Sequence, residues 1–478
     1  MGFLDINFEY TDAQEERIYA PDLIESAFVD INGITESIFK ANKYIVYGPK
    51  GAGKSALASK LKFMSEGEWD FFCDVDDLEE FEFSLLKETS GVSGDNIGGN
   101  VNVWKFLLYI RILSLYEDNN YISDSSSSIG VLFSELKKYG FLSSKSLVQV
   151  VQETSRKGLY TKFSNTVSSI QSSFDKSSDF KVKDPAGLVE AIELALKELS
   201  NIESKHYLII DGLDYLLRDG KGNAGYLVDL IAATRQVNNT FSQLKNESKV
   251  IVLFRDEVLD FLPDPNLTKR INDNGIALDW YDKEGNPFDS YLLKVIENRA
   301  KIAGFDKNIR ELWKSWFPIK IGKKDSILFV LDSTRYLPRD VISFFRAMQS
   351  LRKEPPFDAQ DVYSALTDYS EWFSSELSDA LVGLLDEEVR TSISGILSDI
   401  GPRFSVSGFK QSLLDDNLKE ESAEKILSSL FNTSWIGNIW YKYESPRYAW
   451  KHRREKAVFS ARKNCIVHNG LLRALNLR

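Results

Sequence analysis

Eight residues at 48–55, GPKGAGKS, carry the clearest chemical signal in the chain. They follow the spacing G-x-x-x-x-G-K-[ST], with Gly48, Gly53, Lys54 and Ser55 at the fixed positions. Glycines allow the backbone to curl until successive N–H groups point inward at an anion. Because a lysine and a hydroxyl stand beside that curl, the stretch predicts a loop that binds phosphates and Mg²⁺.

The residues on either side of the loop agree with this interpretation. The apolar run KYIVY at 43–47 predicts a buried strand, and SALASKLKFM at 55–64 predicts a helix with one apolar face. A helix that begins here brings its positive N-terminal end to the phosphates. We expect Lys54 to reach the β- and γ-phosphates of ATP and Ser55 to coordinate Mg²⁺. The residues expected to bind ATP are Gly48, Pro49, Lys50, Gly51, Ala52, Gly53, Lys54, Ser55 and Ala56. The alternative is a glycine-rich turn without a ligand.

A second apolar run supplies candidate carboxylates. YLII at 207–210 is typical of a strand buried on both faces, and Asp211 follows at its carboxyl end, where open α/β sheets bind their ligands. We expect Asp211 to hold Mg²⁺ through water, and Asp214 to orient the attacking water as the general base. The alternatives are an acidic cap on a strand-to-helix turn for Asp211 and a helix N-cap for Asp214.

Three further apolar runs complete a predicted sheet. KVIVLFRDEV at 249–258 contains a strand that ends at Arg255. This strand resembles the sensor-1 strand of ATP sites, which implies that Arg255 monitors the γ-phosphate; the alternative is a surface charge. The other runs are WDFFCDV at 69–75 and GIALDW at 275–280. Together with the two runs above, they make five strands separated by helical stretches. This pattern predicts an α/β fold with a parallel sheet and helices on both faces.

With these motifs the chain resembles ASCE-class P-loop ATPases of the AAA+ and STAND groups. The Walker A loop would be Gly48–Ser55 and the Walker B strand Tyr207–Asp211. IIDGLD is similar to the Walker B motifs of STAND and NACHT-type proteins and departs from the Asp-Glu pair of typical AAA+ enzymes, which leaves the catalytic base open. The resemblance covers roughly residues 20 to 350 and implies ATP and Mg²⁺ as cofactors.

A later stretch, STRYLPRDVISFF at 333–345, resembles the arginine-bearing start of a lid helix, as in sensor 2. Pro338 suits the first turn of a helix. We expect Arg339 to contact the γ-phosphate when the lid folds over the site, with Arg335 as a second candidate; a solvated surface charge is the alternative. YLPRD and the ending IVHNGLLRALNL resemble bacterial P-loop ATPases from anti-phage defence contexts, which implies a partner effector.

The pattern changes along the chain divide it into parts. We predict a P-loop ATPase core at 1–284 with a helical insertion at about 80–200, a helical lid at 285–375, and a winged-helix-like domain at 376–478. Within the insertion, the apolar run at 103–116 is short for a bilayer and predicts a buried helix. The Ser-rich stretches at 123–128 and 172–180 predict loops.

The C-terminal part combines helices with a basic strip. Helical patterns at 388–399, 407–415 and 422–431 precede a predicted hairpin in SWIGNIWYKYESPRYAW. Basic residues follow: Lys451, His452, Arg453, Arg454, Lys456, Arg462 and Lys463. They could contact the phosphates of DNA or RNA, with help from the aromatic residues Tyr443, Tyr448 and Trp450. The alternative is a winged helix that serves packing or oligomer contacts.

Composition limits the remaining possibilities. The net charge of -11 over 478 residues argues against wholesale wrapping of nucleic acid. Cys73 and Cys465 are far apart, which excludes a disulfide framework and favours the cytoplasm, and the three histidines show no metal-ligand spacing. The acidic N-terminus lacks the pattern of a signal peptide, and we expect no membrane association.

Three functions are therefore in competition. The first is an Mg²⁺-dependent ATPase that works as an oligomeric switch or motor, with an arginine in trans for which Arg270 and Arg299 are candidates. The second is a scaffold or sensor that binds ATP with little turnover. The third is a nucleic-acid-binding protein that uses the basic C-terminal region.

Overall fold

The structure is a computed structural model. It describes residues 2–40, 42–79, 81, 100–117, 128–138, 141–142, 146–150, 185–199, 202–213, 224–282, 285–416, 418, 423–454 and 456–477. Asp214, the Ser-rich stretch at 172–180 and most of the one at 123–128 lie outside these residues.

Internal contacts divide the chain into two compact units, which differ from the predicted boundaries. One unit comprises residues 1–32, 48–56 and 278–478. The other comprises residues 33–47 and 57–277. The phosphate loop thus belongs to the same unit as the helical and C-terminal regions.

A five-stranded parallel sheet forms the centre of the second unit, which confirms the predicted α/β architecture. Its order is β2-β3-β4-β1-β5. The strands are β1 (Ile45–Tyr47), β2 (Phe71–Asp77), β3 (Lys205–Asp211), β4 (Ser248–Phe254) and β5 (Gly275–Ala277). The last strand is shorter than predicted, since Leu278 and Trp280 leave the sheet and turn to the phosphate loop.

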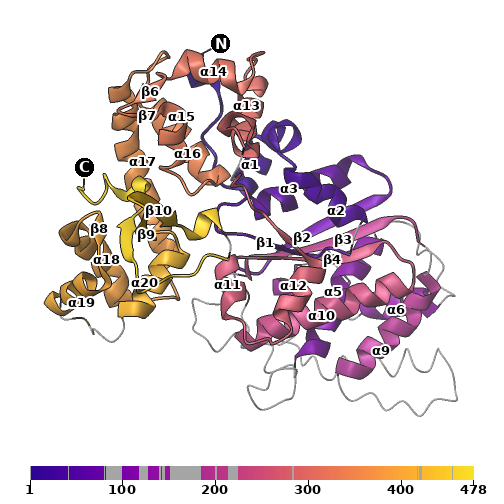
Figure 1. The fold of residues 1–478 in the computed structure, drawn as a ribbon. Coiled ribbons are helices and arrows are strands. Elements are labelled where there is room, and N and C mark those ends of the chain that lie inside the picture. The colour runs from indigo at the N-terminus through magenta and orange to yellow at the C-terminus, as the bar shows by residue number, and fades with distance from the viewer. Residues whose placement is uncertain are drawn as a thin grey trace. The chain divides into compact units, whose positions relative to one another are not determined.

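Helices cover both faces of this sheet. α5 (Val101–Glu117) and α10 (Ala224–Gln243) pack on each other and on the strands (Figure 1). Leu208 and Ile210 join their apolar core, whereas Tyr207 turns to the opposite face and packs on Phe39 of α2 (Ile34–Lys40). This alternation is the period of a strand buried on both sides. Among the described residues, this part also contains α3 (Lys54–Gly67), α6 (Ser128–Lys138), α9 (Pro185–Ala195), α11 (Asp256–Phe261) and α12 (Leu267–Asn274).

α5 is buried along nearly its whole length, as predicted for its apolar run. Its two cations are paired rather than solvated. Arg111 bonds to Asp76 and Asp74 of β2 at 2.7 and 2.6 Å, and Lys105 lies 2.7 Å from Glu193. The helix that we assigned to an insertion therefore packs directly on the sheet, and its charges are buried with partners as burial requires.

The first unit is largely helical. Its central helices are α1 (Ala13–Tyr19), α13 (Tyr291–Ile302), α14 (Ile309–Trp316), α15 (Ser326–Leu331), α16 (Pro338–Ser350) and α17 (Ala359–Ala380), and a short hairpin joins β6 (Lys320–Ile321) to β7 (Lys324–Asp325). Phe3 packs between the rings of Trp316, Phe345 and Phe357, and Gln349 donates to the carbonyls of Phe3 and Ile6. Burial of these aromatic rings fastens the N-terminal segment to the helical region.

The C-terminal part of this unit has the predicted three helices and hairpin. The helices are α18 (Glu387–Ile400), α19 (Val406–Asp415) and α20 (Ala423–Asn432). The strands are β8 (Arg403–Phe404), β9 (Ile436–Lys442), β10 (Ser445–Ala449) and β11 (Asn464–Val467), in the antiparallel order β10-β9-β11-β8. β8 and β11 were not predicted because they are short. Over the described residues, every helix is too short or too polar to cross a bilayer.

Candidate functional site

The GPKGAGKS stretch forms a tight loop between β1 and α3. Gly51 and Gly53 have φ angles of 89° and 91°, and the Ala52 N–H donates to the Pro49 carbonyl at 3.1 Å. Residues with a Cβ rarely adopt such angles. The glycines at these positions therefore permit the curl that an anion-binding loop needs.

Lys54 is the first residue of α3 and is buried. Its Nζ donates to the carbonyls of Gly48 and Pro49 at 2.8 and 3.1 Å. The ammonium group thus lies within the curl of its own loop. This arrangement keeps a positive charge at a helix N-terminus, where anions bind best.

The segment after β5 closes one side of the loop. The indole Nε1 of Trp280 donates to the Ala52 carbonyl at 2.8 Å, and a Cβ at Gly48 would lie 3.1 Å from the Cβ of Leu278. Sequence reasoning missed this contact because it assigned 275–280 to a strand. A large aromatic residue just after a short edge strand was the available signal.

Helix α16, which we predicted to belong to a lid, approaches the loop from another side. A Cβ at Gly51 would lie only 3.0 Å from the Cβ of Arg339, and the Arg339 N–H donates to the Gly51 carbonyl at 3.5 Å. The guanidinium group of Arg339 donates to Glu376 at 3.1 Å and to the Thr11 carbonyl at 3.3 Å. The structure thus brings Arg339 and the phosphate loop together.

Arg335 is in a different environment from Arg339. It is 4% exposed, and its guanidinium group bonds to both carboxylate oxygens of Asp340 at 2.9 and 2.6 Å. The Arg335 backbone N–H also donates to Asp340, at 2.8 Å. The charge of Arg335 is therefore neutralised inside the fold, which does not suit the phosphate contact that we considered for it.

Asp211 and Arg255 belong to the sheet unit. Asp211 ends β3 and pairs in register with Asp77, which ends β2. Gly212 has a φ of 74°, and a Cβ there would lie 2.0 Å from the Asp77 carboxylate. Half-buried Arg255 follows β4 and precedes α11. Asp77 is a second carboxylate at this edge that we did not predict, although the run CDVDD at the end of β2 signalled it.

The two arginines considered for action in trans are both paired. Arg299 forms a buried ion pair with Glu16, and Arg270 lies 2.8 Å from Asp264. Burial on its own raises the pKa of Glu16, and Arg299 opposes that rise. Each arginine is paired with a carboxylate of its own unit, so neither side chain extends into solvent where it could reach a neighbouring subunit.

The basic strip near the C-terminus is only partly exposed. Trp450 is buried, and Arg453 donates to Asp332 at 2.6 Å. The ammonium of Lys463 lies 3.4 Å from the ring centroid of Trp440. Trp450 and Arg453 therefore both make contacts inside the fold, and the contact of this strip with nucleic acid stays a prediction. Tyr443, in contrast, is 90% exposed at the turn between β9 and β10.

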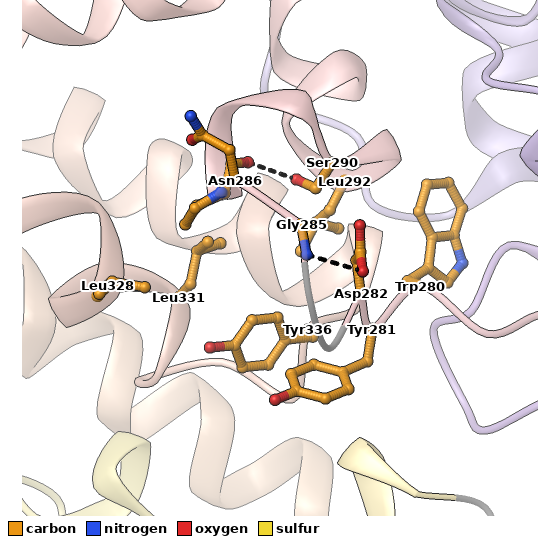
Figure 2. A pocket seen from close by; sticks show the side chains of 11 residues that line it. Trp280, Tyr281, Asp282, Gly285, Asn286, Ser290, Leu292, Leu328, Leu331 and Tyr336 are labelled. Carbon is orange, nitrogen blue, oxygen red and sulfur yellow. Dashed lines mark hydrogen bonds between the residues drawn. The ribbon is translucent and has the colours of Figure 1, made fainter.

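A pocket of about 160 Å³ lies between the segment after β5 and α15. Figure 2 shows its lining, which combines aromatic, aliphatic and polar side chains from Trp280, Tyr281, Asp282, Asn286, Ser290, Leu292, Leu328, Leu331 and Tyr336. Several polar groups are engaged locally, since Asp282 accepts from the Gly285 N–H and Ser290 donates to the Pro287 carbonyl. Trp280 is shared between this pocket and the phosphate loop.

The sequence profile of one family matches part of the chain. Residues 290–378 match the FunZ-associated C-terminal helical domain, a family name associated with defence. A comparison with curated proteins finds no match to this chain.

The matched helical domain extends from the start of α13 nearly to the end of α17. It therefore contains Arg339, which lies against Gly51 of the loop, and Glu376, which pairs with Lys50 of the loop. The region that we predicted as a lid at 285–375 coincides closely with the matched residues.

Proposed function

We propose that the protein is an Mg²⁺-dependent ATPase that works as an oligomeric molecular switch or motor. The observation that carries this proposal is the curl of the GPKGAGKS loop, with Gly51 and Gly53 at positive φ and the Lys54 ammonium inside it. Such a loop offers N–H groups and a cation to an anion of phosphate size. The backbone N–H groups of the loop and the Lys54 ammonium therefore suit the phosphates of a nucleoside triphosphate.

The chain's own residues would divide the work as follows. Lys54 holds the β- and γ-phosphates, Ser55 and Asp211 hold Mg²⁺, and Arg339 binds the γ-phosphate. Bound Mg²⁺ would neutralise charge on the phosphate oxygens. Arg255 remains a candidate γ-phosphate contact and Asp214 a candidate general base.

The setting that we propose is bacterial anti-phage defence with a partner effector. Its support is the match of residues 290–378 to a family with a defence-associated name, together with the resemblance of YLPRD and the C-terminal motif. In this proposal the ATPase assembles with copies of itself and passes its nucleotide state to the effector. An ATP-binding scaffold with little turnover is the nearest alternative.

The test is ATP hydrolysis by the purified full chain, with Lys54→Ala and the matched variant Lys60→Ala on the same helix. Because Lys54 binds the reacting phosphates, its loss should reduce turnover by about 100-fold or more, whereas Lys60→Ala should resemble the wild type. Equal turnover by Lys54→Ala and wild type would refute the assignment. Stoichiometric ATP binding without turnover would favour the scaffold.

One observation favours nucleic-acid binding as a second activity. Tyr443 and Glu444 form a two-residue turn with φ angles of 49° and 63°, so that Tyr443 projects from the tip of the β9–β10 hairpin. Tyr441 and Tyr448 are also exposed, and Lys442 lies 5.6 Å from the Tyr443 ring. Aromatic side chains beside a cation suit stacking on unpaired bases. Single-stranded DNA should bind the wild-type chain more tightly than Tyr443→Ala, and no binding by the wild type at low salt would argue against this activity.

A further inference from the structure

Glu376 of α17 contacts two cations at the phosphate loop. Its Oε2 lies 3.0 Å from the Nζ of Lys50 in the loop, and its Oε1 lies 3.1 Å from Nη1 of Arg339 in the lid helix. Glu376 is 9% exposed. A single buried carboxylate therefore joins the loop, α16 and α17.

This contact differs from an ordinary surface ion pair. Asp379, one helical turn further along, lies 3.6 Å from Lys50 but is 63% exposed at its side chain. Pairs of that exposed kind contribute little. Burial on its own raises the pKa of Glu376, but Arg339, Lys50 and Arg335 outweigh it and lower the pKa below the ordinary value. Glu376 is therefore an anion at neutral pH, and its buried carboxylate lies between two cations that are themselves partly exposed.

We propose that Glu376 is a positioning residue that holds Lys50 and Arg339 until the phosphates of a bound nucleotide take these cations from it. This inference rests on the proposed ATPase function. Arginine binds phosphate oxygens in bidentate geometry, and a triphosphate carries more negative charge than one carboxylate. Since a ligand shifts an equilibrium only by its differential affinity, the competition between carboxylate and phosphate supplies that difference.

The consequence is a link from the nucleotide to the C-terminal region. α17 packs on the C-terminal segment, where Ser370 accepts from the Ala474 N–H at 2.9 Å. A Cβ at Gly470 would lie 2.8 Å from the ring of Phe373, so this interface is tight. Release of Glu376 frees the C-terminal end of α17 from the loop, while the rest of the helix still packs on α16 and on the C-terminal segment. Nucleotide binding would thereby loosen or reposition α17.

The first experiment is a titration of the full chain with a fluorescent N-methylanthraniloyl ATP and Mg²⁺. The variants are Glu376→Gln, the matched exposed variant Glu371→Gln on the same helix, and Lys54→Ala. Glu376→Gln removes the competing anion but keeps the shape of the side chain. The Kd of this variant for the fluorescent ATP should therefore be about tenfold lower than that of the wild type, while Glu371→Gln should bind the nucleotide like the wild type. Equal or weaker binding by folded Glu376→Gln would overturn the inference.

A second measurement on the wild-type protein does not depend on the variant folding. Hydrogen exchange of the backbone amides at 370–380 should rise on addition of Mg²⁺ and ATP, since Glu376 no longer ties α17 to the loop. Unchanged or slower exchange would contradict the proposal.

The two proposals fail in different ways. If wild type binds the nucleotide and Lys54→Ala does not, the phosphate loop works, and a wild-type Kd in Glu376→Gln refutes the role of Glu376 alone. If neither the wild type nor any variant binds the nucleotide, the proposed function falls and this inference with it.

Discussion

Replacement of Arg335 tests how much the buried Arg335–Asp340 ion pair contributes to the stability of the protein. Arg335 and Asp340 are 4% and 0% exposed, and two side-chain bonds of 2.9 and 2.6 Å join them. Arg335→Leu would leave the Asp340 carboxylate buried without its cation, although it would still accept from the backbone N–H of residue 335 at 2.8 Å. Breaking one half of a buried ion pair costs about 3–5 kcal/mol of unfolding free energy.

Urea unfolding followed by tryptophan fluorescence measures this loss. Arg339→Leu is the matched control, because the Arg339 side chain is 24% exposed and its pair with Glu376 is partly solvated. We expect that control to cost only about 1 kcal/mol. The double variant Arg335→Leu with Asp340→Leu should recover most of the loss, since apolar replacement of a buried pair is often neutral. A loss below about 1 kcal/mol for Arg335→Leu, or additive losses in the double variant, would refute the reasoning.

Two further predictions concern a backbone and a buried imidazole. Gly51→Ala and Gly53→Ala should each lower the free energy of unfolding by about 1–2 kcal/mol, because alanine rarely adopts a positive φ. The loss should be larger for Gly51→Ala, because its new Cβ would lie 3.0 Å from the Cβ of Arg339. Equal losses for the two variants in urea unfolding would contradict that close approach. Burial lowers the pKa of His206 to about 3, so below an unfolded pKa of about 6.5 the unfolded chain binds a proton that the folded chain does not. The contribution of His206 to the free energy of unfolding is therefore complete above about pH 6.5 and falls as the pH decreases. Between pH 6 and 4, the free energy of unfolding of the wild type should fall by about 1.4 kcal/mol per pH unit more than that of His206→Phe. Parallel stability curves for the two proteins would refute this account.

Much of the sheet could be predicted from the sequence. Strands buried on both faces are continuous apolar runs, and four of the five predicted runs end within about two residues of the observed strands. Helix starts were also predictable, since Pro338 at the first turn of α16 sets φ before any tertiary contact forms. Short strands such as β8 and β11 could not be found, because two to four residues carry too little pattern.

The residues of the candidate site were also only partly predictable from the sequence. The residues of the phosphate loop were predictable, because positive φ at Gly51 and Gly53 is a local requirement that glycine meets. Asp211 was predictable from its place after an apolar strand. Its neighbour Asp77 was not, since strand order decides which carboxyl ends lie side by side.

By itself, the sequence determined the tight glycine-containing loop at 48–55, the strands and helices around it, and which residue types stand at their ends. Only the tertiary structure decided what each charge does. Arg335 and Arg339 lie four residues apart in one motif. Arg335 forms a buried ion pair with Asp340, whereas Arg339 contacts the loop. Glu376, distant in sequence from Lys50, becomes its partner only when α17 packs. Local patterns set backbone angles and periodicity, whereas the partner of a buried charge depends on which distant elements meet.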